Sequence, residues 1–325
     1  MHIPENYLSP STCAVMAVAA LPVVYTCAKR IKHRVPPERV PLLGVGAALS
    51  FLLMMFNVPV PGGTSAHAVG GTLIAVLLGP EAAVLAVTAA LVIQALFFGD
   101  GGLLALGANI FNMAVLLPSV GYGAFRFLRQ HMPDPLAVGI GAYLGINAAA
   151  FMAALEFGIQ PALFHDAAGQ ALYCPYPLGV SIPAMMIPHL TIAGLAEAIF
   201  SMGIFSFVHK TEMKGLNFNE GFDVNHKALY TLLVVLIILC PLGLLTEATA
   251  WGEWGTDEIS DVVVNGHALA YVPSGMADAW SWAAPFGDYA IPGLPDVTGY
   301  ILSAIIGVAV LTILFKIIAG IRQVS

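Results

Sequence analysis

The chain has 325 residues, of which 58% are hydrophobic and only 10% are charged, and its mean hydropathy is +0.85. Soluble domains carry roughly 25% charged residues, so this composition excludes an ordinary soluble domain and favours a protein whose solvent is the bilayer. The net charge is −7, and we expect membrane lipid rather than nucleic acid around it. The four cysteines form no CxxC pair, so neither a disulfide framework nor a zinc knuckle is expected.

Apolar segments predict about nine membrane-spanning helices, because one crossing needs about 20 mostly apolar residues. The third segment is short for a full crossing, and its glycine-rich flanks indicate that it is broken or tilted. The first is not expected to be a cleaved signal peptide, since its basic cluster follows the apolar run. The chain is therefore predicted to be an all-α polytopic membrane protein. The segments are 10–28, 40–57, 69–78, 82–98, 103–128, 136–158, 181–208, 228–246 and 297–319.

The basic residues predict the orientation. With nine alternating spans, all 12 of them fall on one side of the membrane, and the positive-inside rule makes that side cytoplasmic. The N-terminus is then outside, residues 1–8 form a short outer arm, and the C-terminus is cytoplasmic. The expected location is the plasma membrane of a prokaryote. The basic residues are Lys29, Arg30, Lys32, Arg34, Arg39, Arg126, Arg129, Lys210, Lys214, Lys227, Lys316 and Arg322.

A polar cytoplasmic linker at 210–227 separates two predicted domains, residues 1–215 and 216–325. The second is expected to be a two-span hairpin around an outer loop of residues 247–296. Between 247 and 295 this loop has seven acidic residues, no Lys or Arg, and all four tryptophans of the chain. It is either a solvated loop with interfacial Trp anchors or an acidic surface that gathers cations or docks on the first domain.

The first residues, Met1-His2-Ile3-Pro4, carry the most informative pattern. A free α-amine, the amide nitrogen of residue 2 and Nδ1 of a His at residue 2 close fused five- and six-membered chelate rings. Such rings set three nitrogens nearly in one plane, which suits Ni²⁺ and Cu²⁺ rather than Mg²⁺ or Ca²⁺. The initiator Met must be retained for this, and a bulky second residue favours retention. Taken alone, a His at position 2 is more often a spectator on a frayed end.

A candidate for the fourth nitrogen donor lies in the next outer loop, which reads NVPVPGGTSAH and ends at His67. Prolines stiffen this loop and glycines allow a close turn, so His67 is placed at the same membrane face as His2. Non-helical backbone at membrane depth survives only when it lines a cavity or is buried in protein. A lone His at a span edge is usually an interfacial residue. Ser65 is a candidate for supporting the loop.

Three polar side chains in apolar segments are further candidates. Asn109 and Asn112 either hydrogen-bond a ligand His or its loop, or join two helices. Glu197 lies deep in the 181–208 segment, where an ionisable group is costly and functional by default. We expect it to be protonated or to face a partner subunit, and it is a candidate for coupling. His165 and His189 are expected to be structural.

Two motifs are absent from the sequence. It contains no GxxxxGK[ST], so the chain does not hydrolyse ATP through a P-loop. It contains no HExxH, which disfavours an intramembrane zinc protease.

Four stretches resemble the NikM/CbiM family, the substrate-binding (S) components of energy-coupling factor (ECF) transporters for nickel and cobalt. The resemblance covers about residues 1–210. The C-terminal hairpin, with ATAWGEWG and YAIPGLPDVTGYILSAIIG, resembles a fused NikN-type subunit more loosely. The four stretches are MHIPENYLSP, NVPVPGGTSAHAVGGTLIAVLLGP, FFGDGGLLALGANIFNMA and IPAMMIPHLTIAGLAEA.

The resemblance implies that Met1, through its amine, His2, through its amide and imidazole, and His67 bind the metal. It implies as partners a transmembrane coupling (T) subunit and cytoplasmic ATPase subunits, whose use of ATP tilts the S component to release metal inward. The TSAH loop looks closer to the nickel branch than to the cobalt branch. The expected function is therefore Ni²⁺ binding for an ATP-driven importer, by a subunit that is not itself an enzyme.

Three alternatives stay open. One is Co²⁺ uptake for cobalamin synthesis. Another is a membrane enzyme with Asp100 as its acid or base, which a closed four-nitrogen site disfavours because metal catalysis needs an open coordination position. The third is a passive channel, which needs weaker binding than a multidentate chelate provides. Because its acidic groups are oxygen donors, the hairpin is expected to be dispensable for equilibrium metal binding and needed for uptake.

Overall fold

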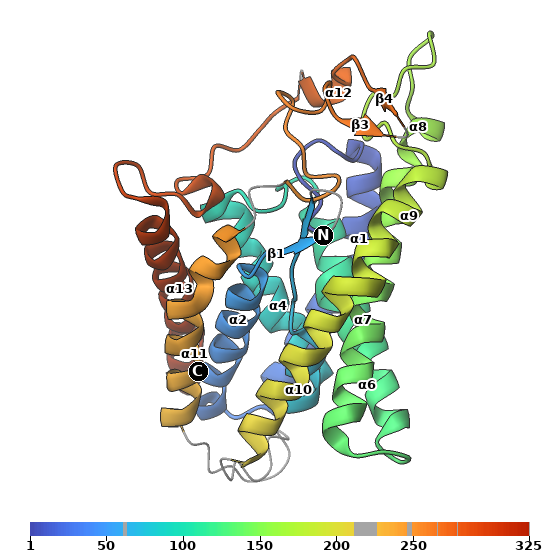
Figure 1. Ribbon diagram of the computed structural model, residues 1–325. Coiled ribbons are helices and arrows are strands. Elements are labelled where there is room, and N and C mark those ends of the chain that lie inside the picture. The colour runs from blue at the N-terminus through green and yellow to red at the C-terminus, as the bar shows by residue number, and fades with distance from the viewer. Residues whose placement is uncertain (61–63, 211–225, 246–248, 265, 278, 325) are drawn as a thin grey trace.

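The computed structural model of the chain describes residues 1–324 except 61–63, 211–225, 246–248, 265 and 278. Within these residues, eight helical segments have the length and apolar composition needed to cross a membrane. They stand side by side as one bundle (Figure 1), which confirms a helical, multi-pass membrane protein. The eight segments are Pro10–Arg34, Pro37–Met54, Pro80–Phe98, Leu106–Leu128, Asp134–Leu163, Leu178–Lys210, Lys227–Leu245 and Asp296–Gln323.

Local sequence signals explain where the helices begin. In α1 (Pro10–Arg34), the Ser9 hydroxyl accepts the Thr12 N–H at 3.1 Å, and a proline occupies the first helical position. Prolines also start α2 (Pro41–Met54) and α4 (Pro80–Ile93). The other long helices are α6 (Leu117–Leu128), α7 (Asp134–Gly158), α9 (Leu178–Pro188), α10 (Gly194–Lys210), α11 (His226–Leu239) and α13 (Asp296–Val324).

The predicted third span, 69–78, differs from the expectation. Its helix, α3 (Gly71–Leu78), has eight residues and is about 12 Å long, against about 30 Å for a hydrocarbon core. It follows an antiparallel hairpin of β1 (Val58–Val60) and β2 (Thr64–Ala66), which the sequence analysis did not predict. The chain between β2 and α3 is buried and has no regular secondary structure, and Gly70 has a left-handed backbone with φ 74°, so the segment is broken, as its glycines indicated.

α3 occupies the middle of the first domain and packs against α4, α6, α7 and α10. Glycines permit close packing in this region. A Cβ atom on Gly141 would lie 2.6 Å from the Gly121 carbonyl oxygen, and one on Gly145 would lie 2.6 Å from that of Leu117. Small residues at such crossings let helices approach within a membrane, where packing drives association. The central position of α3 fixes the loop that precedes it.

In the part of the chain that the structure describes, three π-helical segments interrupt the spans: η2 (Gln94–Phe98), η3 (Ile110–Leu116) and η4 (His189–Ala193). π-helical turns are rare in proteins, and those that occur often lie at functional sites. Short elements complete the chain: η1 (Pro37–Arg39), α5 (Leu106–Asn109), α8 (Gln160–Leu163), η5 (Cys240–Leu245), β3 (Val263–Val264), β4 (His267–Ala268), α12 (Ser274–Ala277) and η6 (Gly287–Tyr289).

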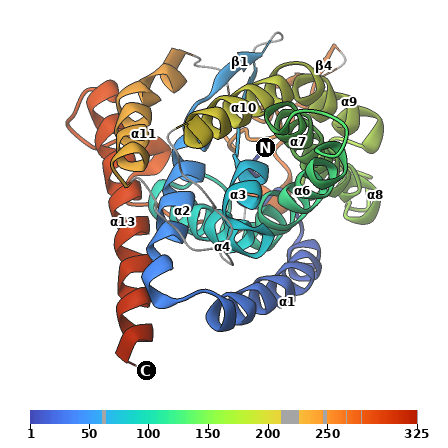
Figure 2. The same cartoon turned by 90° about the horizontal axis from the view of Figure 1, so that it is seen from below.

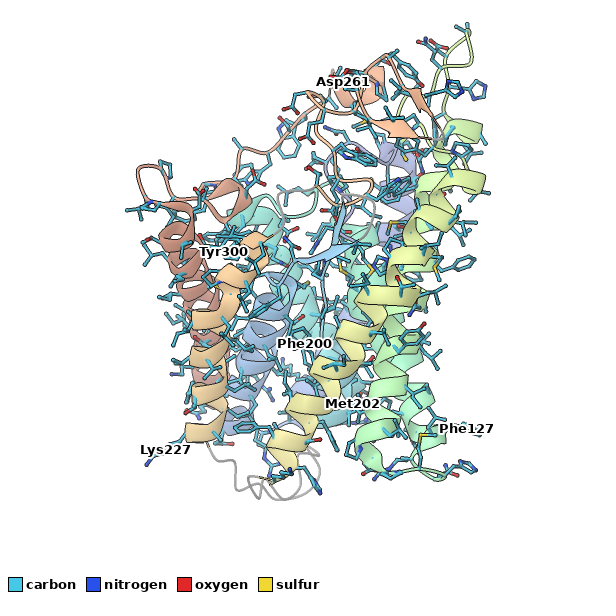
Figure 3. All side chains as sticks on the ribbon, viewed as in Figure 1. Phe127, Phe200, Met202, Lys227, Asp261 and Tyr300 are labelled. Atoms are coloured by element: carbon cyan, nitrogen blue, oxygen red, sulfur yellow. The ribbon has the colours of Figure 1, made fainter. Side chains whose placement is uncertain are left out.

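The C-terminal hairpin packs on the first domain through α13, which lies along α2 (Figure 2). Between α11 and α13, the chain from 249 to 295 runs over the end of the bundle where the N-terminus lies (Figure 1). We call this end the site end. At the opposite, basic end, Arg30 pairs with Glu81 at 3.2 Å, and Arg322 donates to the Lys32 carbonyl at 2.7 Å. Figure 3 shows Asp261 at the site end and Lys227 at the basic end.

Candidate metal centre

The N-terminal arm is folded into the protein at the site end. Met1, His2 and Ile3 are buried, with 4%, 3% and 0% of their surface exposed. Asn109 holds the arm through two hydrogen bonds to the Ile3 backbone. Its Oδ1 accepts the Ile3 N–H at 2.8 Å, and its Nδ2 donates to the Ile3 carbonyl at 3.0 Å. The Gly102 N–H donates to the same carbonyl at 2.9 Å. A frayed end would show none of these contacts.

Met1, His2 and His67 lie together. The Met1 amine nitrogen is 3.2 Å from Nε2 of His67, and the imidazole centroids of His2 and His67 are 4.8 Å apart. His67 Nδ1 lies 3.1 Å from the Ala68 carbonyl oxygen, an acceptor, so Nδ1 carries the ring proton. Nε2 then carries no proton, and its lone pair points to the Met1 amine. Such a second hydrogen bond commonly fixes the tautomer of a metal-binding His.

Two carboxylates contact the same group. Glu253 Oε1 lies 3.2 Å from the Met1 amine, and Asp100 Oδ1 lies 3.0 Å from His2 Nδ1. Asp100 is held in turn by Tyr289, whose hydroxyl donates to its Oδ2 at 2.6 Å, and by the Gln94 amide, which donates at 3.0 Å. The site therefore joins an amine and two imidazoles to a carboxylate from each domain.

Burial keeps the two imidazoles neutral. It lowers the pKa of His2 to about 4, with a further contribution from the charge of the neighbouring amine. The pKa of His67 falls well below its ordinary value for the same reasons. Burial raises the pKa of Asp100, against the opposing effect of the Tyr289 hydrogen bond. Neutral imidazole is the form that binds metal ions, so both rings are ready to act as ligands.

The outer loop of the C-terminal hairpin docks on the first domain, as one of the two interpretations of its acidic sequence proposed. Tyr7 donates its hydroxyl to the Trp254 carbonyl at 2.8 Å, and Asn6 donates its amide to that of Trp280 at 3.1 Å. Phe286 N–H donates to the carbonyl of Phe97 at 2.9 Å. The loop thus covers the N-terminal arm and carries Glu253 and Tyr289 to the site.

A cavity of about 310 Å³ lies beside the predicted ligands, between the two domains. Its wall includes His2, His67 and Asp100 from the first domain and Glu253 and Tyr289 from the second. Among the described residues, no three His, Cys, Asp or Glu side chains form a metal-holding group. The predicted ligand set is of another kind, because it includes the Met1 amine and a backbone amide beside the two imidazoles.

Glu197 lies below the site and anchors its loop. The side chain is fully buried, and its carboxylate accepts the Val69 N–H at 2.7 Å and the Gly70 N–H at 3.0 Å. Ser50 donates to the Val69 carbonyl at 2.8 Å from the other side. Glu197 thus faces the segment that links His67 to α3 rather than the surface. Of the two expected alternatives, a protonated side chain or one that faces a partner subunit, the second does not fit this conformation, because Val69 and Gly70 supply its contacts.

The other predicted residues make no hydrogen bond to Met1, His2 or His67 within the described part of the chain, although the buried His189 is near enough to interact electrostatically with His67 and with the Met1 amine. Asn112 donates to the buried carboxylate of Glu156 at 2.8 Å, three residues beyond Asn109 but toward a different helix. His189 bonds the Met185 carbonyl within its own helix, and His165 lies exposed beyond α8. Ser65 belongs to β2, and its side chain lies outside the described part of the chain.

Gln94 and Tyr289 were not predicted from the sequence, and other roles were expected for Asp100 and Glu253. Gln94 had a signal, as it is the one side-chain amide in the apolar run 82–98. Tyr289 had none, because its partners Gln94 and Asp100 are 195 and 189 residues away. Glu253 was one of seven acids in the outer loop, and nothing local distinguishes it from the others. Metal binding without the hairpin stays a prediction, although Glu253 of the hairpin contacts the Met1 amine.

Comparisons with known proteins agree with this architecture. Residues 2–214 match the family model CbiM, described as a cobalt uptake substrate-specific transmembrane region, and residues 225–323 match the PDGLE domain. The chain is 48% identical to a probable fused nickel transport protein LarMN of Lactiplantibacillus plantarum, over 97% of each chain. It is 41% identical to the fused nickel transport protein NikMN of Rhodobacter capsulatus, over 100% of this chain and 99% of the relative.

One solved structure, a truncated transition metal transporter, is 53% identical with a TM-score of 0.63 and covers 65% of this chain and 99% of its own. The family resemblance drawn from the four sequence stretches is confirmed. The chain belongs to the CbiM family, and a PDGLE domain follows the family region in the same polypeptide.

Proposed function

We propose that the chain binds Ni²⁺ as the substrate-specificity component of an ATP-driven ECF-type importer in the plasma membrane of a prokaryote. The observation that carries this proposal is the 3.2 Å approach of the Met1 amine to Nε2 of His67, beside the ring of His2. These residues supply the amine, an amide and two imidazoles, the four nitrogens of a planar site. The nickel transport relatives favour nickel over cobalt as cargo.

The proposed ligands need one rearrangement. As the side chains lie in the structure, Nδ1 of His2 faces Asp100, and its Nε2 is buried without a hydrogen-bond partner among the described residues. Chelation by the amine, the amide and Nδ1 requires a half turn of the ring about its Cβ–Cγ bond. Asp100 then loses one contact and keeps those to Tyr289 and Gln94.

The site end faces the outside in this proposal, because the positive-inside rule assigns the basic end to the cytoplasm. The cavity between the domains gives a hydrated cation a path to the nitrogens, and the carboxylates of Asp100 and Glu253 attract it. The partners are a transmembrane coupling subunit and separate ATPase subunits, since the chain has no P-loop. Glu197 couples α10 to the His67 loop through Val69 and Gly70.

The decisive experiment changes only the first ligand. One residue added before Met1, or acetylation of its amine, removes a nitrogen donor, and nickel binding is expected to disappear while the fold remains. The His2→Ala and His67→Ala variants should lose most binding, whereas the exposed His165→Ala and His267→Ala controls should not. Unchanged nickel stoichiometry in the extended protein would refute the chelate.

Spectroscopy separates the cargo candidates. Four coplanar nitrogens, one of them an ionised amide, favour low-spin Ni²⁺, so the loaded protein should be yellow and diamagnetic. Cu²⁺ would bind at least as tightly by the general affinity order, so its rejection depends on its availability. A green paramagnetic complex, or Zn²⁺ displacing Ni²⁺ at equal concentration, would contradict a planar site. Tighter binding of Co²⁺ than of Ni²⁺ would favour the cobalt alternative.

A further inference from the structure

An apolar groove of about 560 Å³ lies between α1, α4 and α13, with α2 at its base. α1 packs against α4 while α13 packs against α2, so α1 and α13 stand apart at the edge of the bundle (Figure 2), and side chains from both line the groove. Ile31, Leu43 and Phe315 line it. From Leu85 to Ile93 it follows α4 for about 12 Å at 1.5 Å per residue. It shares no lining residue with the cavity at the candidate metal centre.

The mouth of the groove is positively charged. Lys32 and Arg322 line it at the basic end. The Arg322 guanidinium donates to the carbonyls of Lys32 and Val35, each at 2.7 Å, which fixes its position without neutralising its charge. The nearby carboxylate of Glu81 is used by Arg30 and by Arg34, at 3.2 and 3.8 Å. Among the described residues, no carboxylate pairs with Lys32 or Arg322, so both charges are available.

A polar group also lies inside the groove. Thr88 lines it, and the Thr88 hydroxyl is buried with no hydrogen-bond partner among the described residues. Thr88 is one helical turn further from the basic end than Leu85, so the hydroxyl lies deeper than the cations and among apolar side chains. Leaving a hydroxyl unpaired in such surroundings is unfavourable. A ligand with an acceptor at this depth would satisfy it.

We propose that the groove is a binding site for one anionic phospholipid of the leaflet at the basic end. One acyl chain fills the apolar length along α4, and an ester carbonyl accepts the Thr88 hydroxyl. The phosphate group lies between Lys32 and Arg322. Basic pockets between transmembrane helices on the cytoplasmic side bind anionic headgroups in this way. A partner helix would fill the apolar part and leave the two charges and the hydroxyl without partners.

The test measures lipid binding to the purified, delipidated full chain in detergent by native mass spectrometry. Phosphatidylglycerol and phosphatidylcholine with identical acyl chains are compared. One phosphatidylglycerol should bind saturably and about tenfold or more tighter than phosphatidylcholine, since each basic side chain contributes about fivefold. Lys32→Gln should lower its affinity about fivefold on the same basis. Ala89→Phe, which fills the groove, should abolish binding of both lipids.

Arg126→Gln is the matched control, because it removes a charge from the same end of the bundle away from the groove. It should leave phosphatidylglycerol binding unchanged, and nickel titration of each variant reports that the fold is intact. Equal affinity for the two lipids, equal losses in Lys32→Gln and Arg126→Gln, or full binding by Ala89→Phe would each overturn the proposal. So would a groove that takes no lipid and becomes protected only when transporter subunits are added.

Discussion

Asn109 offers the sharpest test of how the protein builds the candidate metal centre. Replacing it by leucine keeps a side chain of similar volume and removes both hydrogen bonds to Ile3, the residue that follows His2. The Ile3 carbonyl keeps the Gly102 N–H as a partner, whereas the Ile3 N–H donates to Asn109 Oδ1. The substitution therefore leaves one buried donor unpaired.

The expected cost follows from these two bonds. An orphaned buried N–H costs about 1–3 kcal/mol, and loss of the second bond, whose acceptor stays paired, costs about 1 kcal/mol. The docked arm is then destabilised by about 2–4 kcal/mol. Apparent affinity falls with the fraction of chains whose arm is docked, so this cost sets an upper limit of roughly 30- to 1,000-fold on the loss. We expect Asn109→Leu to weaken nickel binding by about tenfold or more.

The assay is a nickel titration in competition with a chelator of known affinity, with the melting temperature measured on the same samples. Asn112→Leu is the control, since Asn112 is equally buried but bonds Glu156 instead of the arm. It should lower the melting temperature and leave nickel affinity within about threefold of the parent, because its partner lies outside the site. If Asn109→Leu loses stability like the control and keeps its affinity, the arm is held by other contacts and the reasoning is wrong.

Three further predictions concern the carboxylates and the imidazoles. Glu197→Gln should weaken nickel binding about tenfold by loosening the His67 loop, because each charge-assisted bond is worth about 1.5–3 kcal/mol; Glu156→Gln, as control, should not. Glu253→Gln should change equilibrium nickel affinity less than about fivefold. The empty site carries the +1 charge of the Met1 ammonium, and the loaded site carries +1 from Ni²⁺ and the ionised amide, so the attraction of Glu253 is similar in both states. Nickel association should be slower in this variant, and a large loss of affinity would make Glu253 a ligand. In buffer without metal, the melting temperature should fall as pH drops from 6.5 to 4, because His2 takes up a proton at higher pH in the unfolded chain than in the folded protein. This difference in pKa is worth about 3 kcal/mol of stability. An equally steep fall of the melting temperature in His2→Ala would contradict the prediction.

Much of the fold could be predicted because apolar length and basic residues report directly on membrane crossing. The break in the segment 69–78 was indicated by its short apolar run. The β-hairpin before it was not predicted, since prolines argue against a strand. Met1 and His2 were proposed as ligands from a chelate that needs no tertiary structure, and His67 from a loop on the same membrane face; the structure brings the three residues together, and metal binding by them stays a prediction. Long-range partners such as Tyr289 and Gln94 could not be found, because nothing in the local sequence states which of many polar groups meet.

The three π-helical segments were also invisible in the sequence, and η4 has a mechanical consequence. A π-helical turn bonds residue i to i+5, so it contains more residues than an α-helical turn. A shift of η4 to α-helical bonding would turn the chain beyond it about its axis by roughly 100°, the angle that one residue spans. Glu197, four residues beyond Ala193, would then lose its hydrogen bonds to Val69 and Gly70, and the segment between His67 and α3 would no longer be held by α10. In that event, torsion of α10 alone would remove the contact that holds the His67 loop.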